Sequence, residues 1–487
     1  MLAALTSCET VKNTVPLDLP THAINVAEQS AEKDPLFAST KDWVAKDWWK
    51  VFEDEQLSDF IQRAFIRNPT LQITRANILL AAYNADKARA ARFPHLNWAG
   101  DVSRQKLSET GLIPFSAQPL PQGQAPLAIP PGTNLIPVYF TQTETEFILN
   151  YDFDIWNKNR NTWLSALDEV QSKIADEAFS RLQLSISVAK VYFQLQINYK
   201  RREVLQELFN NRNKYVQFIK NRLAQNIDTN IAKNNAEINL THVRGQLYQV
   251  EADIIIEEYQ LKTYLAGTFD EDIFNTHVAE KPLPKVPLPK EIPLHLIAHR
   301  PDIIAQIWLI ESAGWQIEVA RAGFYPDFNI AAIFGFQTIH LQELFKWPSS
   351  YYNIDPAFTL PIFDGGRLIS NLHNSEVNFD LAILKYNDLI LNATRDVLEG
   401  IATLRITNQQ LQELKKQTGH LEDSNRLTDL RVKHHVSSGL DYLVSEADVL
   451  NARDQELQYL GKTYEAILSL IKALGGGYDA CYEEGIL

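Results

Sequence analysis

Proline is absent from two long parts of this chain. All 22 prolines lie outside residues 138–281 and 362–487. Because proline removes a backbone hydrogen-bond donor and clashes with the preceding helical turn, long unbroken helices need such proline-free stretches. Small and polar residues interrupt each stretch once, near Asp228 and near Gly439. The sequence therefore predicts two hairpins of two helices each, with arms of roughly 60 to 70 residues, or about 100 Å at a rise of about 1.5 Å per residue.

Apolar residues recur at heptad spacing along these stretches. One series advances in steps of seven and consists of Ile383, Ile390, Val397, Leu404 and Leu411. A sustained heptad pattern is typical of helices that pack as coiled coils. Each hairpin is therefore expected to bury an apolar stripe against neighbouring helices.

The chain also contains an internal repeat. A shift of 232 residues places Pro69 on Pro301, together with seven further identities. Further along, the shift becomes 207, since Arg160 of YDFDIWNKNR then falls on Arg367 of FTLPIFDGGR. The difference of 25 residues predicts an insertion in the first copy, in the proline-rich segment LIPFSAQPLPQGQAPLAIPPGTNLIP. Such a composition is typical of an exposed loop.

Each copy contains two segments in which apolar and polar residues alternate. The four apolar series are Leu96, Trp98, Gly100 and Val102; Phe147, Leu149, Tyr151, Phe153 and Ile155; Phe328, Ile330, Ala332, Phe334 and Phe336; and Phe358, Leu360 and Ile362. A period of two predicts a half-buried β-strand. A length of about 10 residues is also that of a membrane-spanning strand.

Two interpretations of these strands remain open. A water-soluble sheet packed on a core shows the same alternation. Four strands cannot close a barrel within one chain, and an open sheet edge cannot face lipid. If the strands do span a membrane, several chains must share one barrel.

The composition argues against several functional classes. A net charge of -14 is unfavourable for binding nucleic acid, because phosphate contacts need clustered lysine and arginine. Two cysteines cannot build a disulfide framework or a four-cysteine zinc site. No catalytic order of serine, histidine and aspartate is present, and Gly475-Gly476-Gly477 lacks the lysine of a phosphate-binding loop and predicts a flexible helix end. We therefore expect no catalytic residue, no metal, no cofactor and no enzymatic activity.

The N-terminus suggests attachment of lipid. Leu5-Thr6-Ser7-Cys8 is similar to the box that precedes the modified cysteine of bacterial lipoproteins. The basic segment and the apolar stretch of a secretory signal are missing ahead of it. The hypothesis is that Cys8 carries lipid, palmitate included, and the alternative is an accidental match.

These features together resemble the TolC-like outer-membrane efflux proteins, also called outer membrane factors, and among them the OprM/NodT-like lipoprotein branch. The segments that carry the resemblance are LTSC, DWWKVFEDEQLSDFIQRAFIRNPTL, ARFPHL, YDFDIWNKNR, RPDI, ARAGFYPDF, PIFDGGRL and SSGLDYLVSEADVLNAR.

The resemblance implies an α+β membrane protein and a homotrimer. Each protomer would give four strands to a shared twelve-stranded barrel in the outer membrane, and long coiled-coil hairpins to a periplasmic α-barrel. The implied partners are a periplasmic adaptor protein, an inner-membrane pump of the resistance-nodulation-division type and outer-membrane lipid. The implied function is passive conduction of drugs or other small molecules to the outside.

The predicted organisation has six segments. They are a lipobox remnant at 1–8, an N-terminal periplasmic segment at 9–67, a first repeat at 68–281, a proline-rich extended linker at 282–299, a second repeat at 300–474 and a tail at 475–487.

Two groups of residues are candidate functional residues. The resemblance implies that Asp441 narrows the tunnel as a ring of three carboxylates, with Asp228 at the other tip as a second candidate. The alternative for Asp441 is a residue that caps a helix or compensates its dipole. The predicted strand-to-helix joints contain Asp364, Gly365, Gly366, Arg367 and Arg160.

Two other functions remain as alternatives. The first is an outer-membrane channel for type I protein secretion. The second is a soluble coiled-coil structural or interaction protein, which would explain the heptads but not the aromatic strands.

Overall fold

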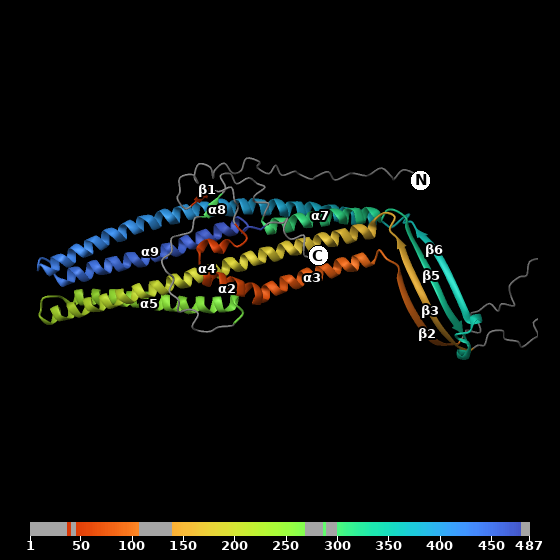
Figure 1. Cartoon of the computed structure of the whole chain (residues 1–487), viewed down its shortest axis with the longest axis horizontal. Coiled ribbons are helices and arrows are strands. Elements are labelled where there is room, and N and C mark those ends of the chain that lie inside the picture. Colours follow the sequence, from red (N-terminus) through yellow and green to blue (C-terminus); the bar gives the residue numbers. More distant parts are fainter. Residues whose placement is uncertain (1–36, 40–44, 107–138, 268–285, 289–299, 479–487) are drawn as a thin grey trace, which may run out of the picture. The chain divides into compact units, whose positions relative to one another are not determined.

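The computed structural model describes residues 37–39, 45–106, 139–267, 286–288 and 300–478 (Figure 1). The chain forms two compact units. The helical unit consists of Met1–Ala81, Asp168–Ile310 and Asp380–Leu487, and the sheet unit consists of Ala82–Leu167 and Glu311–Phe379. The predicted loop between the first two strands, most of the linker, and Cys8 lie outside the described residues.

The sheet unit contains a four-stranded antiparallel sheet. Its strands are β2 (His95–Lys106), β3 (Tyr139–Phe153), β5 (Asp327–Thr338) and β6 (Ser350–Thr359), in the order β2-β3-β5-β6. Two strands per repeat were predicted, and this is confirmed. The predicted ends are wrong, because Ile155 lies beyond β3, and Leu360 and Ile362 lie beyond β6. In the helical unit, β1 (Phe37–Ser39) and β4 (Val286–Leu288) form a short parallel pair.

Four long helices form the two predicted hairpins (Figure 1). The first arms, α4 (Lys158–Ala224) and α8 (Arg367–Lys433), have 67 residues each, as predicted. The second arms, α5 (Asn230–Tyr264) and α9 (Gly439–Ala473), have only 35, so the predicted length is wrong for them. Residues with positive φ follow both shorter helices, namely Ala266 and Gly267 after α5 and Gly475 to Gly477 after α9. A residue in the left-handed backbone conformation cannot continue a right-handed helix, so these residues mark the ends of α5 and α9.

The two copies correspond at a shift of 209 rather than 207. The first residues of α4 and α8 are 158 and 367, their last are 224 and 433, and α5 and α9 differ by the same amount. The turns agree as well, since Asn226 and His435 have φ values of 60° and 61°. The insertion in the first copy is therefore 23 residues, not 25. The alignment of Arg160 with Arg367 was misleading, because Lys158 is the structural counterpart of Arg367.

Three shorter α-helices also lie among the described residues. They are α2 (Glu55–Arg67), α3 (Pro69–Ala90) and α7 (Pro301–Ala322). The last two begin with proline, which fits the first helical position because its missing N–H would have no partner there. Among the described helices, none has an apolar stretch long enough to cross a membrane.

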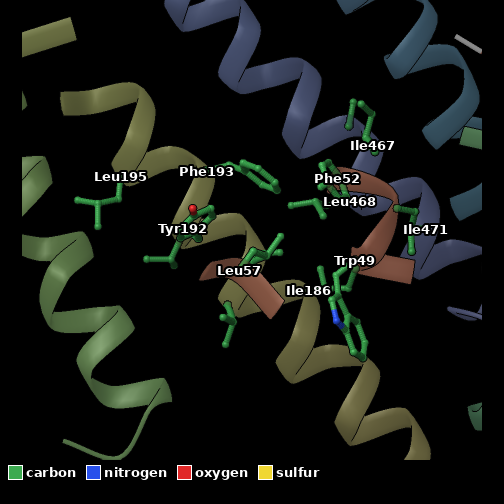
Figure 2. Close-up of a cluster of buried hydrophobic side chains, with 14 of the residues drawn as sticks. Trp49, Phe52, Leu57, Ile186, Tyr192, Phe193, Leu195, Ile467, Leu468 and Ile471 are labelled. Carbon is green, nitrogen blue, oxygen red and sulfur yellow. The ribbon is translucent and has the colours of Figure 1, made fainter. Parts of the chain in front are cut away.

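The core of the helical unit forms around an N-terminal aromatic cluster. Trp48 is only 1% exposed, and its ring meets Trp49 and Phe52 edge-on at centroid distances of 5.8 and 6.2 Å. Phe52 lies beside Phe193 of α4 (Figure 2), with a distance of 4.8 Å between ring centroids. Phe193 in turn stacks on Tyr464 of α9 at 4.5 Å. This short segment therefore ties a helix of the first hairpin to a helix of the second.

The triple glycine after α9 belongs to the same core. A Cβ atom on Gly475 would lie 3.2 Å from Cα of Arg300, and one on Gly476 would lie 2.2 Å from Leu182. Both glycines also have positive φ, at 82° and 60°. They are therefore needed where the chain passes close to its neighbours, which a flexible helix end does not require.

Candidate functional site

The sheet has one apolar and one polar face. The register pairs Leu96 with Leu149, Phe147 with Phe334, and Phe334 with Tyr352, so the members of the four predicted apolar series that lie within the strands share one face. Several large side chains on this face are exposed in the single chain, including Trp98 (69%), Tyr352 (78%) and Phe358 (71%). A contiguous aromatic surface of this kind needs an apolar environment.

The opposite face is polar and carries a tie that spans three strands. Glu146, Gly335 and Tyr351 are successive cross-strand neighbours on β3, β5 and β6. The Tyr351 hydroxyl lies 2.5 Å from Oε2 of Glu146 and also contacts Glu144. A Cβ atom on Gly335 would lie 2.6 Å from the carbonyl oxygen of Thr145, so only glycine fits under the tyrosine. Sequence reasoning missed this contact, because it depends on the register.

The second strand-to-helix joint is built around Asp364. Its carboxylate accepts hydrogen bonds from the backbone N–H groups of Gly366 (3.1 Å) and Leu368 (2.9 Å) at the start of α8. Gly365 and Gly366 have φ values of 67° and 90°, which glycine adopts at little cost. The Arg367 guanidinium is 67% exposed and lies 4.0 Å from Asp364.

The first joint is built from different residues. Asp154 accepts hydrogen bonds from the backbone N–H groups of Asn159 (2.9 Å) and Arg160 (2.7 Å), and Asn157 takes the positive φ of 58°. Arg160 contributes its backbone to this cap. Sequence reasoning missed Asp154, although an acidic residue just ahead of a helix start is a recognisable capping signal.

The two hairpin tips hold the candidate constriction residues. Asp441 is exposed and occupies the third position of α9, where it forms a capping box with Ser438. The Ser438 N–H donates to Asp441 at 2.9 Å, and the Asp441 N–H donates to the Ser438 hydroxyl at 3.3 Å. Asp228 accepts a hydrogen bond from Nε of Arg222 at 2.7 Å. Sequence reasoning found no basic partner for Asp228, although Arg222 and Arg431 are counterparts in the repeat.

A buried polar network links the two hairpins. Arg201 of α4 donates from Nε to Asp454 of α9 at 2.8 Å, and these side chains are only 16% and 7% exposed. Arg201 also donates to Asn198, which in turn donates to Glu257 of α5 at 2.8 Å. The contact between Arg201 and Asp454 joins residues 253 positions apart, so no local pattern could reveal it.

Glu257 is a buried member of this network whose hydrogen bonding is incomplete. Its Oε2 atom is buried without a hydrogen-bond partner among the described residues. Burial, with a smaller contribution from Asp253, raises the pKa of Glu257 to about 7, against the opposing effects of Asn198 and Arg201. A carboxylate that must lose water without gaining enough partners destabilises the folded state.

This pKa predicts a pH dependence of stability. Between the unfolded value near 4.5 and the folded value near 7, the folded state binds more protons, so stability falls as pH rises through this window. Glu257→Gln should remove this loss and stabilise the helical unit by about 1–2 kcal/mol above pH 7, after allowance for solvent screening. Thermal unfolding from pH 4.5 to 8 measures this difference in stability between wild type and Glu257→Gln, with Glu251→Gln as the control. Parallel pH profiles for wild type and Glu257→Gln would contradict the prediction.

Among the described residues, no group of three or more His, Cys, Asp or Glu side chains could hold a metal ion.

Comparisons with known proteins agree with this architecture. The sequence model described as outer membrane efflux protein matches residues 60–267 and 293–476. The multidrug resistance outer membrane protein MdtP of Escherichia coli K12 is 26% identical over 454 residues, covering 93% of this chain and 91% of MdtP. MdtQ of Escherichia coli O6:H1 is 29% identical over 446 residues, covering 90% and 89%.

A solved structure shows the same fold. The outer membrane protein VceC of Vibrio cholerae superposes with a TM-score of 0.73 at 27% identity, covering 90% of this chain and 100% of VceC. The α+β architecture of an outer-membrane efflux channel is thereby confirmed, and the soluble coiled-coil alternative is wrong. Since the family model covers most of the sequence, the chain belongs to the outer membrane efflux protein family, a family of channels of the bacterial outer membrane.

Proposed function

We propose that this protein is the outer-membrane channel of a tripartite efflux system. It conducts drugs or other small molecules passively, receiving them from a resistance-nodulation-division pump through a periplasmic adaptor. The observation that carries the proposal is the sheet, whose exposed aromatic face suits lipid and whose polar face suits a water-filled lumen. The relatives named as multidrug resistance proteins support drugs as the substrate class.

The sheet edges favour a homotrimer. Within the described residues, β2 and β6 are each paired on one side only. Unpaired backbone N–H and C=O groups are unfavourable in lipid, so the two edges need strands from other copies. Three copies supply the twelve strands of one closed barrel.

Reconstitution tests the channel. The detergent-purified protein should be trimeric and should produce discrete conductance steps in planar lipid bilayers. Deletion of its gene should increase drug susceptibility in the host. Recovery of the protein in the soluble fraction without detergent would contradict the proposal.

Lipidation of Cys8 is part of the same proposal. The lipid would add to the attachment that the barrel itself provides. Incorporation of labelled palmitate should be lost in Cys8→Ala, and equal labelling of both proteins would rule the site out.

Asp441 is proposed to form a ring of carboxylates at the tunnel tip, with the ion-paired Asp228 as the second candidate. Such a ring favours cations and binds divalent ions. We predict that Asp441→Asn, which keeps an acceptor for the Ser438 N–H, and Asp441→Ala, which does not, both raise single-channel conductance and weaken block by divalent cations. If Asp441 acts only as a cap, Asp441→Asn will conduct like wild type.

A further inference from the structure

The charged residues of the four-stranded sheet are separated by face. Within these four strands, every acidic residue lies on the polar face, namely Asp101, Glu144, Glu146, Asp152, Asp327 and Asp355. The lysine and arginine residues of the same strands are Arg104 and Lys106, and both lie on the opposite face, in line with Leu96, Trp98 and Val102 of β2. The apolar face of the sheet therefore carries two positive charges and no negative one.

Arg104 and Lys106 lie at the end of the sheet that is away from the helices. The chain enters β2 from α3 and β5 from α7, and it leaves β3 into α4 and β6 into α8, so all four joints lie at one end (Figure 1). The two basic residues lie at the other end of β2, beyond the apolar Val102. On the lipid-facing side of a barrel, a cation is strongly unfavourable at the middle of the bilayer and nearly neutral at the headgroups. Their position therefore fits the level of the headgroups.

The surroundings of the two cations are those of a membrane–water interface. Arg104 lies opposite Thr141, and Lys106 lies opposite Tyr139 on β3. The Lys106 ammonium is 5.4 Å from the centre of the Tyr139 ring, which is 59% exposed. Tyrosine and tryptophan are enriched at this level of a membrane. Neither cation forms an ion pair with another described residue, so both charges can bind an anion from outside the chain.

The turn between β5 and β6 extends the apolar face at the same end of the sheet. Its side chains Phe345 and Trp347 are each 77% exposed. The Phe345 ring meets the ring of Phe336, which lies on the apolar face of β5, at 5.9 Å between centroids. An apolar surface thus continues past the end of β5, next to side chains that can bind an anion.

We infer that Arg104 and Lys106 bind the phosphate groups of lipid in the outer leaflet of the membrane. This inference rests on the proposed outer-membrane barrel and adds a lipid-binding site on its outer rim. Arginine binds phosphate through paired N–H donors, and lysine binds it as a point charge. The acyl chains of the same lipid would lie against Trp98 and Val102. A lipid fits better than free phosphate, because it supplies an anion for the cations together with acyl chains for the exposed apolar face.

A carboxylate of another copy is the competing occupant. Within the described residues, β2 is an edge strand, so a neighbouring copy could bring an acidic side chain to Arg104 or Lys106. In that case the two cations would need no lipid phosphate.

Native mass measurement of the detergent-purified trimer tests the site. The two probes are diphosphorylated lipid A and lipid A without its phosphates, which share their sugars and acyl chains. Wild type should bind the phosphorylated probe about 10-fold more tightly than the phosphate-free probe. Arg104→Gln/Lys106→Gln should weaken binding of the phosphorylated probe by about 30-fold, because each basic residue near an anionic lipid surface contributes about fivefold. Binding of the phosphate-free probe should not change.

The matched control moves both cations to the polar face of β2. Ser103→Arg/Arg104→Ser/Gln105→Lys/Lys106→Gln has the composition and net charge of wild type, but positions 103 and 105 lie on the polar face. We expect this variant to bind phosphorylated lipid A as weakly as the double glutamine variant does.

Three results would overturn the lipid site. They are equal affinity of wild type for both probes, unchanged affinity in Arg104→Gln/Lys106→Gln, and wild-type affinity in the variant with the moved cations. The second result would leave the carboxylate of another copy as the occupant, and the third would show that net charge alone attracts the lipid. A wild-type protein that is monomeric in detergent and forms no conductance steps would instead overturn the proposed barrel, so the two failures are distinguishable.

Discussion

Trp48→Ala should lower the stability of the helical unit by about 3–5 kcal/mol, the range for removing a large buried aromatic side chain. Trp48 is 1% exposed, packs on Trp49 and Phe52, and donates from Nε1 to the Ser185 hydroxyl at 3.3 Å. The truncation therefore leaves a cavity and also a buried serine that loses a partner. The midpoint of thermal unfolding in detergent, at fixed protein concentration, measures the effect.

Trp347→Ala is the control for this prediction. Trp347 is 77% exposed, so its removal should leave the midpoint almost unchanged. Equal midpoints for Trp48→Ala and Trp347→Ala would show that the N-terminal aromatic cluster does not support the helical unit.

The sequence predicted those parts of the fold that follow from a repeating pattern. The period of two along each strand assigns Phe147 and Phe334 to the apolar faces of their strands, because successive side chains of a strand point to opposite sides. The register places the two residues opposite each other on one face. Absence of proline likewise predicted α4 and α8, since a helix continues until something stops it.

The sequence was less informative where one residue decides the outcome. The end of α5 depends on the positive φ of Ala266, a residue type that seldom marks a helix end. The shift of 207 came from identities around Arg160, whereas the two joints use different capping residues, Asp154 and Asp364. Sequence identity in a short joint is thus weaker evidence than the shared bounds of two long helices.

The candidate site shows the same division. The tip positions of Asp228 and Asp441 were predicted from the breaks between helices, and both lie at the hairpin tips. Their immediate partners, Arg222 and Ser438, are local and could have been found by comparing the copies. The pairing of Arg201 with Asp454 could not have been predicted from the sequence, because it depends on how the two hairpins pack.

That pairing leads to the second large prediction. Arg201→Ala should lower the stability by about 3–5 kcal/mol, because it leaves the buried Asp454 carboxylate without its cation. The side-chain amide oxygen of Asn198 also loses the hydrogen bond that Arg201 donates to it, which weakens the link from Asn198 to Glu257 of α5. The same thermal measurement in detergent reports the loss.

Two variants separate this effect from a general loss of arginine. Arg426→Ala removes an ion pair with Asp423 whose side chains are 66% and 72% exposed, and exposed pairs contribute only about 0–1 kcal/mol. Arg201→Leu/Asp454→Leu removes both charges, and an apolar replacement of a buried pair is often close to neutral. We therefore expect the double variant to be more stable than Arg201→Ala alone. If Arg201→Ala unfolds at the wild-type temperature, the network does not hold the two hairpins together, and their association rests on the apolar contacts around Phe193 and Tyr464.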